Sequence, residues 1–389
     1  MNYLLARVTL TTVLGLLFAL AYTVVTPPRL LTEPGLLDAS PGPAEVVSPA
    51  TVPARTPTPT FAESPAFSEA RELLALPHLT GAGVLVSPSG KLVAYVRLAT
   101  LSQHAVLYVS RLENGETWEV FSSPAPIRYD WFPDSKRLML AALVAEPDRY
   151  GLAMVNADGT GLRWIGGPPE ANYGIRDLAV SPDGGYVAYT ALVGVHPALT
   201  AQAVVEIVRS SGGAPLRLAG PEPSLREPQW TPDGRGLVFF QGRPQGFSSG
   251  DSYLVELDTK GKRLVFPGGR FLGWSPDGRY ALWLGDLNSQ TGERGLWRTR
   301  ADGSQPDILA VDVGLLQASW TASADWVVYR SVLGGVSRLW LTRADRSDVK
   351  LLAEGGVLGP AWLPKTGLIY RSLDPQSERL VLLPLRVPR

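Results

Sequence analysis

Residues 246–250, Gly-Phe-Ser-Ser-Gly, match the Gly-x-Ser-x-Gly pattern that surrounds a nucleophilic serine in α/β-hydrolases. That chemistry needs a strand before the serine, a helix after it, and an aspartate and then a histidine later in the chain. The three histidines of this chain are His78, His104 and His196, so none follows Ser248. We therefore expect residues 246–250 to form a loop between two strands, and we expect no hydrolase domain.

The sequence offers little for metal or cofactor chemistry. Asp286-Leu287-Asn288 begins like a calcium-binding loop, but Thr291 and Trp297 occupy the sixth and twelfth positions, where such a loop needs Gly and Glu. There are 0 cysteines, which excludes a thiolate zinc site and a cysteine nucleophile. We expect no metal and no cofactor, and we predict that the protein is not an enzyme.

Charged and polar residues recur immediately before a series of short apolar segments. They are Arg128, Arg176, Asp177, Arg226, Glu227, Arg270 and Gln317. We predict that they surround one mouth of a central channel and capture a protein partner; solvated loop charges are the alternative interpretation. Replacing Arg176, Arg226 and Arg270 together is expected to weaken partner capture without lowering thermal stability. With 36 Lys+Arg against 36 Asp+Glu, the chain has no basic surface for nucleic acid.

The elements that position these residues are seven copies of one pattern, of which Trp-Ser-Pro-Asp-Gly-Arg at 274–279 is the fullest example. The proline-equivalent positions are 88, 133, 182, 232, 276, 322 and 364. Each copy predicts a strand, a tight turn and a second strand, and further apolar stretches supply strands three and four. Four strands per repeat of this length indicate a β-propeller.

Two kinds of residue recur with structural roles. The turn aspartates are Asp134, Asp183, Asp233 and Asp277, which we expect to accept backbone hydrogen bonds rather than to act as acids or bases. Two positions before the proline stand Trp131, Trp230, Trp274, Trp320 and Trp362. We expect these indoles to lie between adjacent blades, and an aromatic ligand cage is the less favoured alternative.

The last repeat lacks a fourth strand, and residues 70–76 resemble the fourth-strand segments of the other repeats. We therefore predict an all-β fold: a seven-bladed β-propeller over residues 68–389, closed by an N-terminal strand that completes the last blade. A ring closed in this way leaves no unpaired sheet edge at the join.

The repeated Trp-Ser/Thr-Pro-Asp-Gly-Arg motif, followed by an apolar strand, resembles the WD-like repeat of the TolB β-propeller family. The resemblance covers residues 68–389 and implies the fold more specifically than any function. TolB proteins carry an α/β domain before a six-bladed propeller, whereas here a hydrophobic segment and a Pro-rich stretch precede seven repeats. The resemblance therefore does not imply a Tol–Pal role.

Residues 1–26 contain 19 consecutive uncharged positions, Val8–Thr26, preceded by Arg7. A run of this length spans a bilayer as one hydrophobic helix, and a cleaved signal peptide is the alternative. Residues 27–67 hold ten prolines in 41 positions, which predicts an extended stalk. We expect an extracytoplasmic propeller that is anchored through residues 8–26 or secreted. Its predicted function is that of a protein-interaction scaffold at the cell envelope; the alternative is a small-ligand sensor or an enzyme using the central channel.

Overall fold

The computed structural model describes residues 67–75, 83–98, 104–144, 149–167, 174–193, 202–243, 246–288, 293–363, 367–374 and 377–384. The chain divides into two compact units, residues 1–59 and 60–389. The predicted leader at 1–26 lies outside the described residues, and so does the stalk except for Phe67. Within the described part of the chain, no helix has the length and hydrophobicity needed to cross a membrane.

The described residues fold as β-strands, which confirms the predicted all-β class. Sheet 1 contains β2 (Leu85–Val86), β3 (Leu92–Leu98), β4 (Ala105–Arg111) and β5 (Thr117–Ser123). Sheet 2 contains β6 (Arg128–Trp131), β7 (Arg137–Val144), β8 (Arg149–Asn156) and β9 (Arg163–Gly166). Sheet 3 contains β10 (Ile175–Val180), β11 (Tyr186–Val193), β12 (Gln202–Arg209) and β13 (Leu216–Glu222).

Sheets 4 and 5 repeat this order. Sheet 4 contains β14 (Leu225–Trp230), β15 (Gly236–Arg243), β16 (Gly246–Glu256) and β17 (Lys262–Phe266). Sheet 5 contains β18 (Gly269–Trp274), β19 (Tyr280–Asn288), β20 (Glu293–Arg300) and β21 (Asp307–Val313). In all five sheets the strands pair with their neighbours in chain order, and every pair is antiparallel.

Sheet 6 has seven strands, in the order β1-β27-β26-β25-β24-β23-β22. Its strands are β22 (Leu315–Trp320), β23 (Trp326–Leu333), β24 (Val336–Arg343), β25 (Val349–Leu363), β26 (Gly367–Asp374), β27 (Ser377–Pro384) and β1 (Arg71–Ala75). The long strand β25 pairs with β24 through residues 349–355 and with β26 through residues 356–363. It therefore serves as the last strand of one four-stranded set and the first strand of the next.

The N-terminal strand β1 pairs with the C-terminal strand β27. The antiparallel partners are Arg71 and Leu382, Glu72 and Val381, Leu74 and Leu380, and Ala75 and Arg379. The Ser68 amide also donates to the Pro384 carbonyl at 2.9 Å. Residues 71–75 thus occupy the fourth-strand position that the last repeat lacks.

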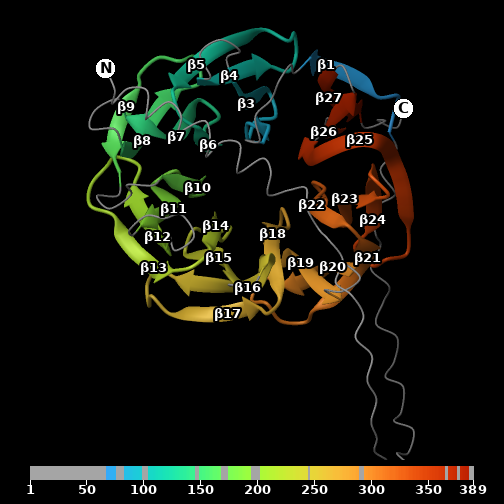
Figure 1. Ribbon diagram of the computed structural model, residues 1–389. Helices are drawn as coiled ribbons and strands as arrows, with labels where there is room; N and C mark the ends of the chain where they lie inside the picture. Colours follow the sequence, from blue (N-terminus) through green and yellow to red (C-terminus); the bar gives the residue numbers. More distant parts are fainter. Residues whose placement is uncertain are drawn as a thin grey trace, which may run out of the picture. The chain divides into compact units, whose positions relative to one another are not determined.

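The sheets follow one another around a centre, with β6, β10, β14, β18 and β22 on the inner side (Figure 1). The hydrophobic core lies between neighbouring sheets rather than within one sheet. Phe132 of sheet 2 and Tyr189 of sheet 3 share one such cluster. Val93 and Tyr95 of β3 share another with Leu380 of β27, which joins the first sheet to the last. Because each sheet is buried on both faces, the inner strands are held in fixed positions.

Residues 246–250 are not the loop that we expected. They form the first part of β16, and Gly250 pairs with Gly242 of β15. The loop between β15 and β16 is therefore shorter than the sequence suggested, because Gly246 and Gly250 still pair with residues of β15. A strand at this position also lacks the helix that a nucleophilic serine would need after it.

Candidate functional site

The predicted channel-mouth residues stand at the beginnings of the inner strands. Arg128 opens β6, and Arg176 and Asp177 lie in the first half of β10. Arg226 and Glu227 occupy the corresponding part of β14. In the next two sheets the positions are taken by Arg270 of β18 and Gln317 of β22. The inner strands surround one centre (Figure 1). Because these residues lie in the first half of their strands, they belong to the same end of the inner strands.

Contacts between neighbouring sheets link five of these residues into one arc. The Arg128 Nε donates to the Arg176 carbonyl at 2.8 Å. The Asp177 Oδ2 accepts a hydrogen bond from the Glu227 amide at 3.1 Å. The Arg270 Nε lies 2.6 Å from the Glu227 Oε2. The arc therefore runs through sheets 2, 3, 4 and 5.

Gln317 does not join this arc through a direct contact. Its Oε1 accepts a hydrogen bond from the Gly359 amide of β25 at 3.2 Å, and its side chain is exposed. Gln317 thus connects the inner strands β22 and β25 of sheet 6.

A cavity of about 640 Å³ opens beside the arc. Asp130, Asp177 and Glu227 line it, one from each of β6, β10 and β14, together with the indole-bearing residues Trp131 and Trp230. A volume of this size lies within the range of small-molecule sites in proteins. Three residues that carry carboxyl groups therefore border one small-molecule-sized space.

The sequence analysis missed Asp130. It stands three residues before the turn proline, where the other repeats have uncharged residues such as Ala179, Gln229 and Gly273. A charged residue that interrupts a repeated uncharged position is a signal that could have identified it. Its carboxylate accepts hydrogen bonds from the backbone amides of Val180 and Trp131, each at 2.8 Å. The hydrogen bond from Val180 connects β6 to β10.

The carboxyl groups of the site hold their protons more tightly than carboxyls in water do. Burial raises the pKa of Asp130 to about 6, although the Val180 and Trp131 amides oppose the rise. Burial also raises the pKa of Asp177 against the Glu227 amide and Arg176. For Glu227, burial raises the pKa and the Arg270 guanidinium lowers it. Carboxyl groups adjusted in this direction suit proton transfer near neutral pH.

Two further arginines belong to the same region and were not predicted. Arg330 of β23 pairs with Gln317 of β22, and Arg371 of β26 pairs with Leu358 of β25. Both stand in the tripeptide Tyr-Arg-Ser, at 329–331 and 370–372, and this repetition is visible in the sequence. Arg371 forms an ion pair with Glu378 of β27.

The repeated tryptophans lie at the boundaries between sheets. The indole N–H of Trp131 donates to the Leu85 carbonyl at 3.0 Å, and that of Trp230 donates to the Ala179 carbonyl at 3.0 Å. The Trp274 indole donates to the Trp230 carbonyl at 2.7 Å. In sheet 6, Trp320 is buried and Trp362 makes an edge contact with Phe67.

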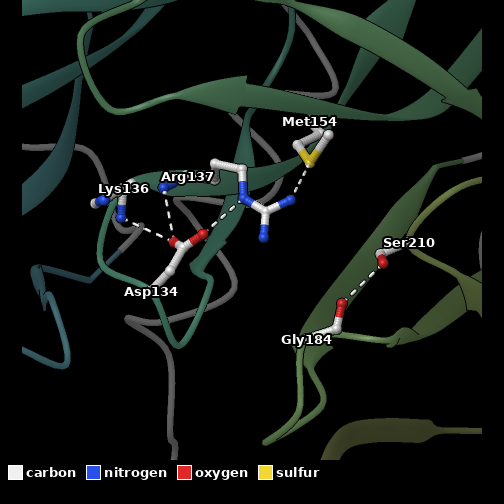
Figure 2. Close-up of polar contacts among 6 residues, drawn as sticks. All are labelled: Asp134, Lys136, Arg137, Met154, Gly184 and Ser210. Atoms are coloured by element: carbon white, nitrogen blue, oxygen red, sulfur yellow. Dashed lines mark hydrogen bonds and ion pairs between the residues drawn. The ribbon is translucent and has the colours of Figure 1, made fainter.

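The repeated aspartates organise the tight turns at the other end of the inner strands. Asp134 accepts hydrogen bonds from the Lys136 amide at 2.9 Å and from the Arg137 Nε at 2.7 Å (Figure 2). The Arg137 Nη1 donates a hydrogen bond to the Met154 sulfur (Figure 2). In the next repeat, Ser210 Oγ donates to the Gly184 carbonyl (Figure 2).

The other turn aspartates make equivalent contacts. Each of these carboxylates accepts one hydrogen bond from a side-chain hydroxyl and one from a backbone amide of its own turn; they are Asp183, Asp233 and Asp277. The hydrogen bonds from Ser181 and Thr231 lower the pKa values of Asp183 and Asp233. These carboxylates are therefore ionised and engaged in the turns.

The other residues considered for chemistry lie elsewhere. Asp286 belongs to β19 and lies 3.2 Å from the Arg294 Nε, so its carboxylate already has a cationic partner. His104 is exposed, whereas His78 and His196 fall outside the described residues.

Comparison with known proteins shows the fold. No family model matches the chain. An uncharacterised protein of Agrobacterium fabrum is 30% identical over 197 residues, which span 49% of this chain and 58% of that protein. The chain thus spans somewhat more than half the length of this curated relative.

Several solved structures are similar. An oligogalacturonate lyase in complex with manganese has a TM-score of 0.62 at 12% identity, over 79% of this chain and 89% of the lyase. The β-propeller domain of the Trilobed protease of Pyrococcus furiosus has a TM-score of 0.58 at 18% identity, over 77% and 95%. A TolB from Agrobacterium tumefaciens is 22% identical over 70% and 95%, with a TM-score of 0.45. The similarity to the lyase and to the protease domain shows that the chain is a β-propeller, which is the fold that the TolB-like resemblance implied.

The prediction that the protein is not an enzyme is wrong. Two oligogalacturonate lyases share the fold, and the similar region covers 89% and 99% of their chains. These lyases consist almost entirely of the region that is similar to this chain, and they are enzymes. Our prediction depended on finding no hydrolase domain in the sequence, and that observation does not exclude catalysis.

One of the similar lyases was solved in complex with manganese. Among the described residues, no group of three His, Asp or Glu side chains is placed to hold a metal ion. We derive no chemical step through manganese for this chain.

Proposed function

We propose that the protein binds a small ligand in a cavity of the central channel, against the inner strands β6, β10 and β14, and performs acid–base chemistry on it there. The observation that carries the proposal is the cavity of about 640 Å³ lined by Asp130, Asp177 and Glu227. Burial raises the pKa of all three carboxyl groups. A protonated carboxyl can donate a proton to a leaving group, and an ionised neighbour can accept one.

The scaffold for this site is, in our proposal, a seven-bladed propeller closed by β1. The pairing of β1 with β27 supports closure, and so does the cluster that packs Val93 and Tyr95 of sheet 1 against Leu380. One similar structure, the Trilobed protease domain, is described as having an open velcro topology. A closed ring would hold the ligand-binding ends of the inner strands at fixed distances, as an acid–base site requires.

The fold neighbours suggest a first probe. Oligogalacturonate is, by its name, a chain of sugar acids, and a trimer fits a cavity of this size. The test is calorimetric titration with trigalacturonate, followed by an assay of its cleavage. We expect binding and slow cleavage by the wild-type protein. Binding without cleavage would identify the site as a sensor, and no binding at millimolar concentration would contradict the proposal.

Variants at the site sharpen this test. Asp177→Asn and Glu227→Gln are expected to lower the cleavage rate about 100-fold, since general acid–base catalysis contributes roughly 10²–10⁴ in rate. Asp302→Asn is the matched control because Asp302 is an exposed turn residue of sheet 5 that caps the Ser304 amide. Equal rates in all three variants would show that the chemistry lies elsewhere.

Export and a protein partner remain predictions. We propose that residues 8–26 tether or export the propeller and that a partner protein docks at the same channel mouth. The arc of charged residues from Arg128 to Arg270 supports a docking function there. Capture with the Arg176→Gln/Arg226→Gln/Arg270→Gln protein tests it: capture equal to wild type would exclude the mouth as the docking site.

A further inference from the structure

Six arginines lie near the end at which the inner strands begin. Arg176 and Arg226 directly precede Asp177 and Glu227, which line the cavity of the candidate site, whereas none of the six arginines lines it. Arg128, Arg176, Arg226 and Arg270 come from the first strands of sheets 2 to 5, and Arg330 and Arg371 come from the second strands of the two sets in sheet 6. Arg330 and Arg371 are adjacent to the inner strands through their partners Gln317 and Leu358. The positive charges therefore continue around the centre from sheet 2 to the end of sheet 6.

These guanidinium groups repel one another. Burial lowers the pKa of Arg226; the charges of Arg270 and Arg176 act in the same direction, whereas the carboxylates of Glu227 and Asp177 oppose the fall. Burial also lowers the pKa of Arg330, and the charge of Arg371 contributes. Cations of one sign held close together and partly desolvated are unfavourable unless an anion offsets them.

The protein supplies only part of that anionic charge. Arg270 is paired with Glu227, and Arg371 is paired with Glu378. Arg226 lies over the Phe240 ring at 4.8 Å. Across the described ranges, no carboxylate lies within ion-pair distance of Arg128, Arg176 or Arg330, although Asp177 interacts with the first two over a longer distance.

We propose that this arginine ring binds a ligand that carries at least two oxyanion groups, so that the ligand supplies the missing negative charge. A planar guanidinium forms two parallel hydrogen bonds to a carboxylate or a phosphate, which makes arginine suited to both. This inference rests on the proposed function and specifies its ligand class. The raised pKa values of Asp130, Asp177 and Glu227 fit the same picture, because a protonated carboxyl does not repel an anionic ligand.

A matched pair of ligands tests the charge directly. Trigalacturonate and its fully methyl-esterified form have the same sugar skeleton, but only the acid is charged. By calorimetry we expect the acid to bind at least tenfold more tightly at low salt, and to lose much of that advantage in 0.5 M NaCl. Tripolyphosphate is the third ligand: if it binds more tightly than the acid, the oxyanion chemistry holds and the ligand is a phosphate.

Variants separate the ring from other sources of affinity. Arg176→Gln and Arg330→Gln are each expected to weaken binding of the acid about tenfold, whereas binding of the ester changes little. Arg176→Lys keeps the charge and loses the paired geometry, so we expect an intermediate affinity. Arg263→Gln is the control because Arg263 lies exposed on the outer strand β17. Thermal unfolding checks that each variant is folded.

The outcomes distinguish this inference from the proposed function. If the ester binds as tightly as the acid, the cavity binds sugars and the ring does not select anions, so the inference is overturned while the proposed function survives. If neither sugar nor tripolyphosphate binds, both fail. Equal binding of the acid by Arg176→Gln, Arg330→Gln and Arg263→Gln would likewise overturn the inference.

Discussion

The Nε of Arg270 lies 2.6 Å from the Oε2 of Glu227, a residue of the neighbouring sheet. The same Glu227 donates its backbone amide to Asp177 at 3.1 Å, so one glutamate connects three sheets. Side chains from separate repeats thus form a single ionic arrangement, because the inner strands β10, β14 and β18 each carry charged residues at the same end.

The first prediction concerns the proton affinity of Glu227. Arg270→Gln removes the cation that lowers the pKa of Glu227, so burial will dominate and the pKa will rise further. Carboxyl titration by NMR measures this, with Arg263→Gln as the control. An unchanged titration curve for Glu227 would show that the ion pair does not set its proton affinity.

The second prediction concerns Asp130 and the pH dependence of stability. Its pKa is raised from 3.8 to about 6 in the folded protein, so the folded state binds this proton more tightly than the unfolded chain does. Stability contributed by the group is therefore lost as the pH rises from about 4 to about 6, by on the order of 2–3 kcal/mol at most. We expect Asp130→Asn to remove this decline, and urea unfolding at pH 4.5 and pH 7.5 measures it. The same decline in both proteins would assign it to other groups.

The third prediction compares two tryptophans with equal burial. Trp230 and Trp320 are each 6% exposed, but only the Trp230 indole N–H has an acceptor among the described residues, the Ala179 carbonyl. Trp230→Phe loses that hydrogen bond, so it should destabilise the protein by about 1 kcal/mol more than Trp320→Phe. Chemical denaturation of both variants provides the measurement. A larger loss for Trp320→Phe would contradict the importance of the bond between sheets.

The fourth prediction concerns a turn that lacks its glycine. Gly278 has φ of +69°, and Ala324 takes the equivalent position of a later repeat with φ of +59°. An L-residue pays a steric penalty in this region that glycine avoids. Ala324→Gly should raise stability by about 0.5–1 kcal/mol and Gly278→Ala should lower it by about 1 kcal/mol, as thermal unfolding will show. Destabilisation by Ala324→Gly would mean that chain entropy outweighs the strain.

Much of the fold follows from the repeated turn, because Pro-Asp-Gly between two apolar segments encodes a hairpin without reference to the rest of the chain. The pairing of residues 71–75 with β27 was also predictable, since the last repeat visibly lacks a strand. The continuation of β16 through Gly246 was not, because glycine-rich segments look alike in loops and at strand ends.

The candidate site was only partly predictable for a physical reason. Residues such as Arg176 and Arg226 occupy the same position within their repeats. Their placement at one end of the inner strands could therefore be inferred from the circular arrangement of the repeats. Arg330 and Arg371 reach the same region from second strands, and Asp130 acquires its altered pKa only through burial between β6 and β10. Proximity across strands and desolvation are properties of the folded chain, not of any local segment.

The most direct measurement of the central claim is a crystal structure of the protein soaked with trigalacturonate. We expect density for the ligand in the cavity beside Asp177 and Glu227, with its carboxylates on the guanidinium groups of Arg176 and Arg226, which directly precede those two residues. Ligand density on the outer strands or at the turn aspartates, or a cavity without ligand at saturating concentration, would contradict the account.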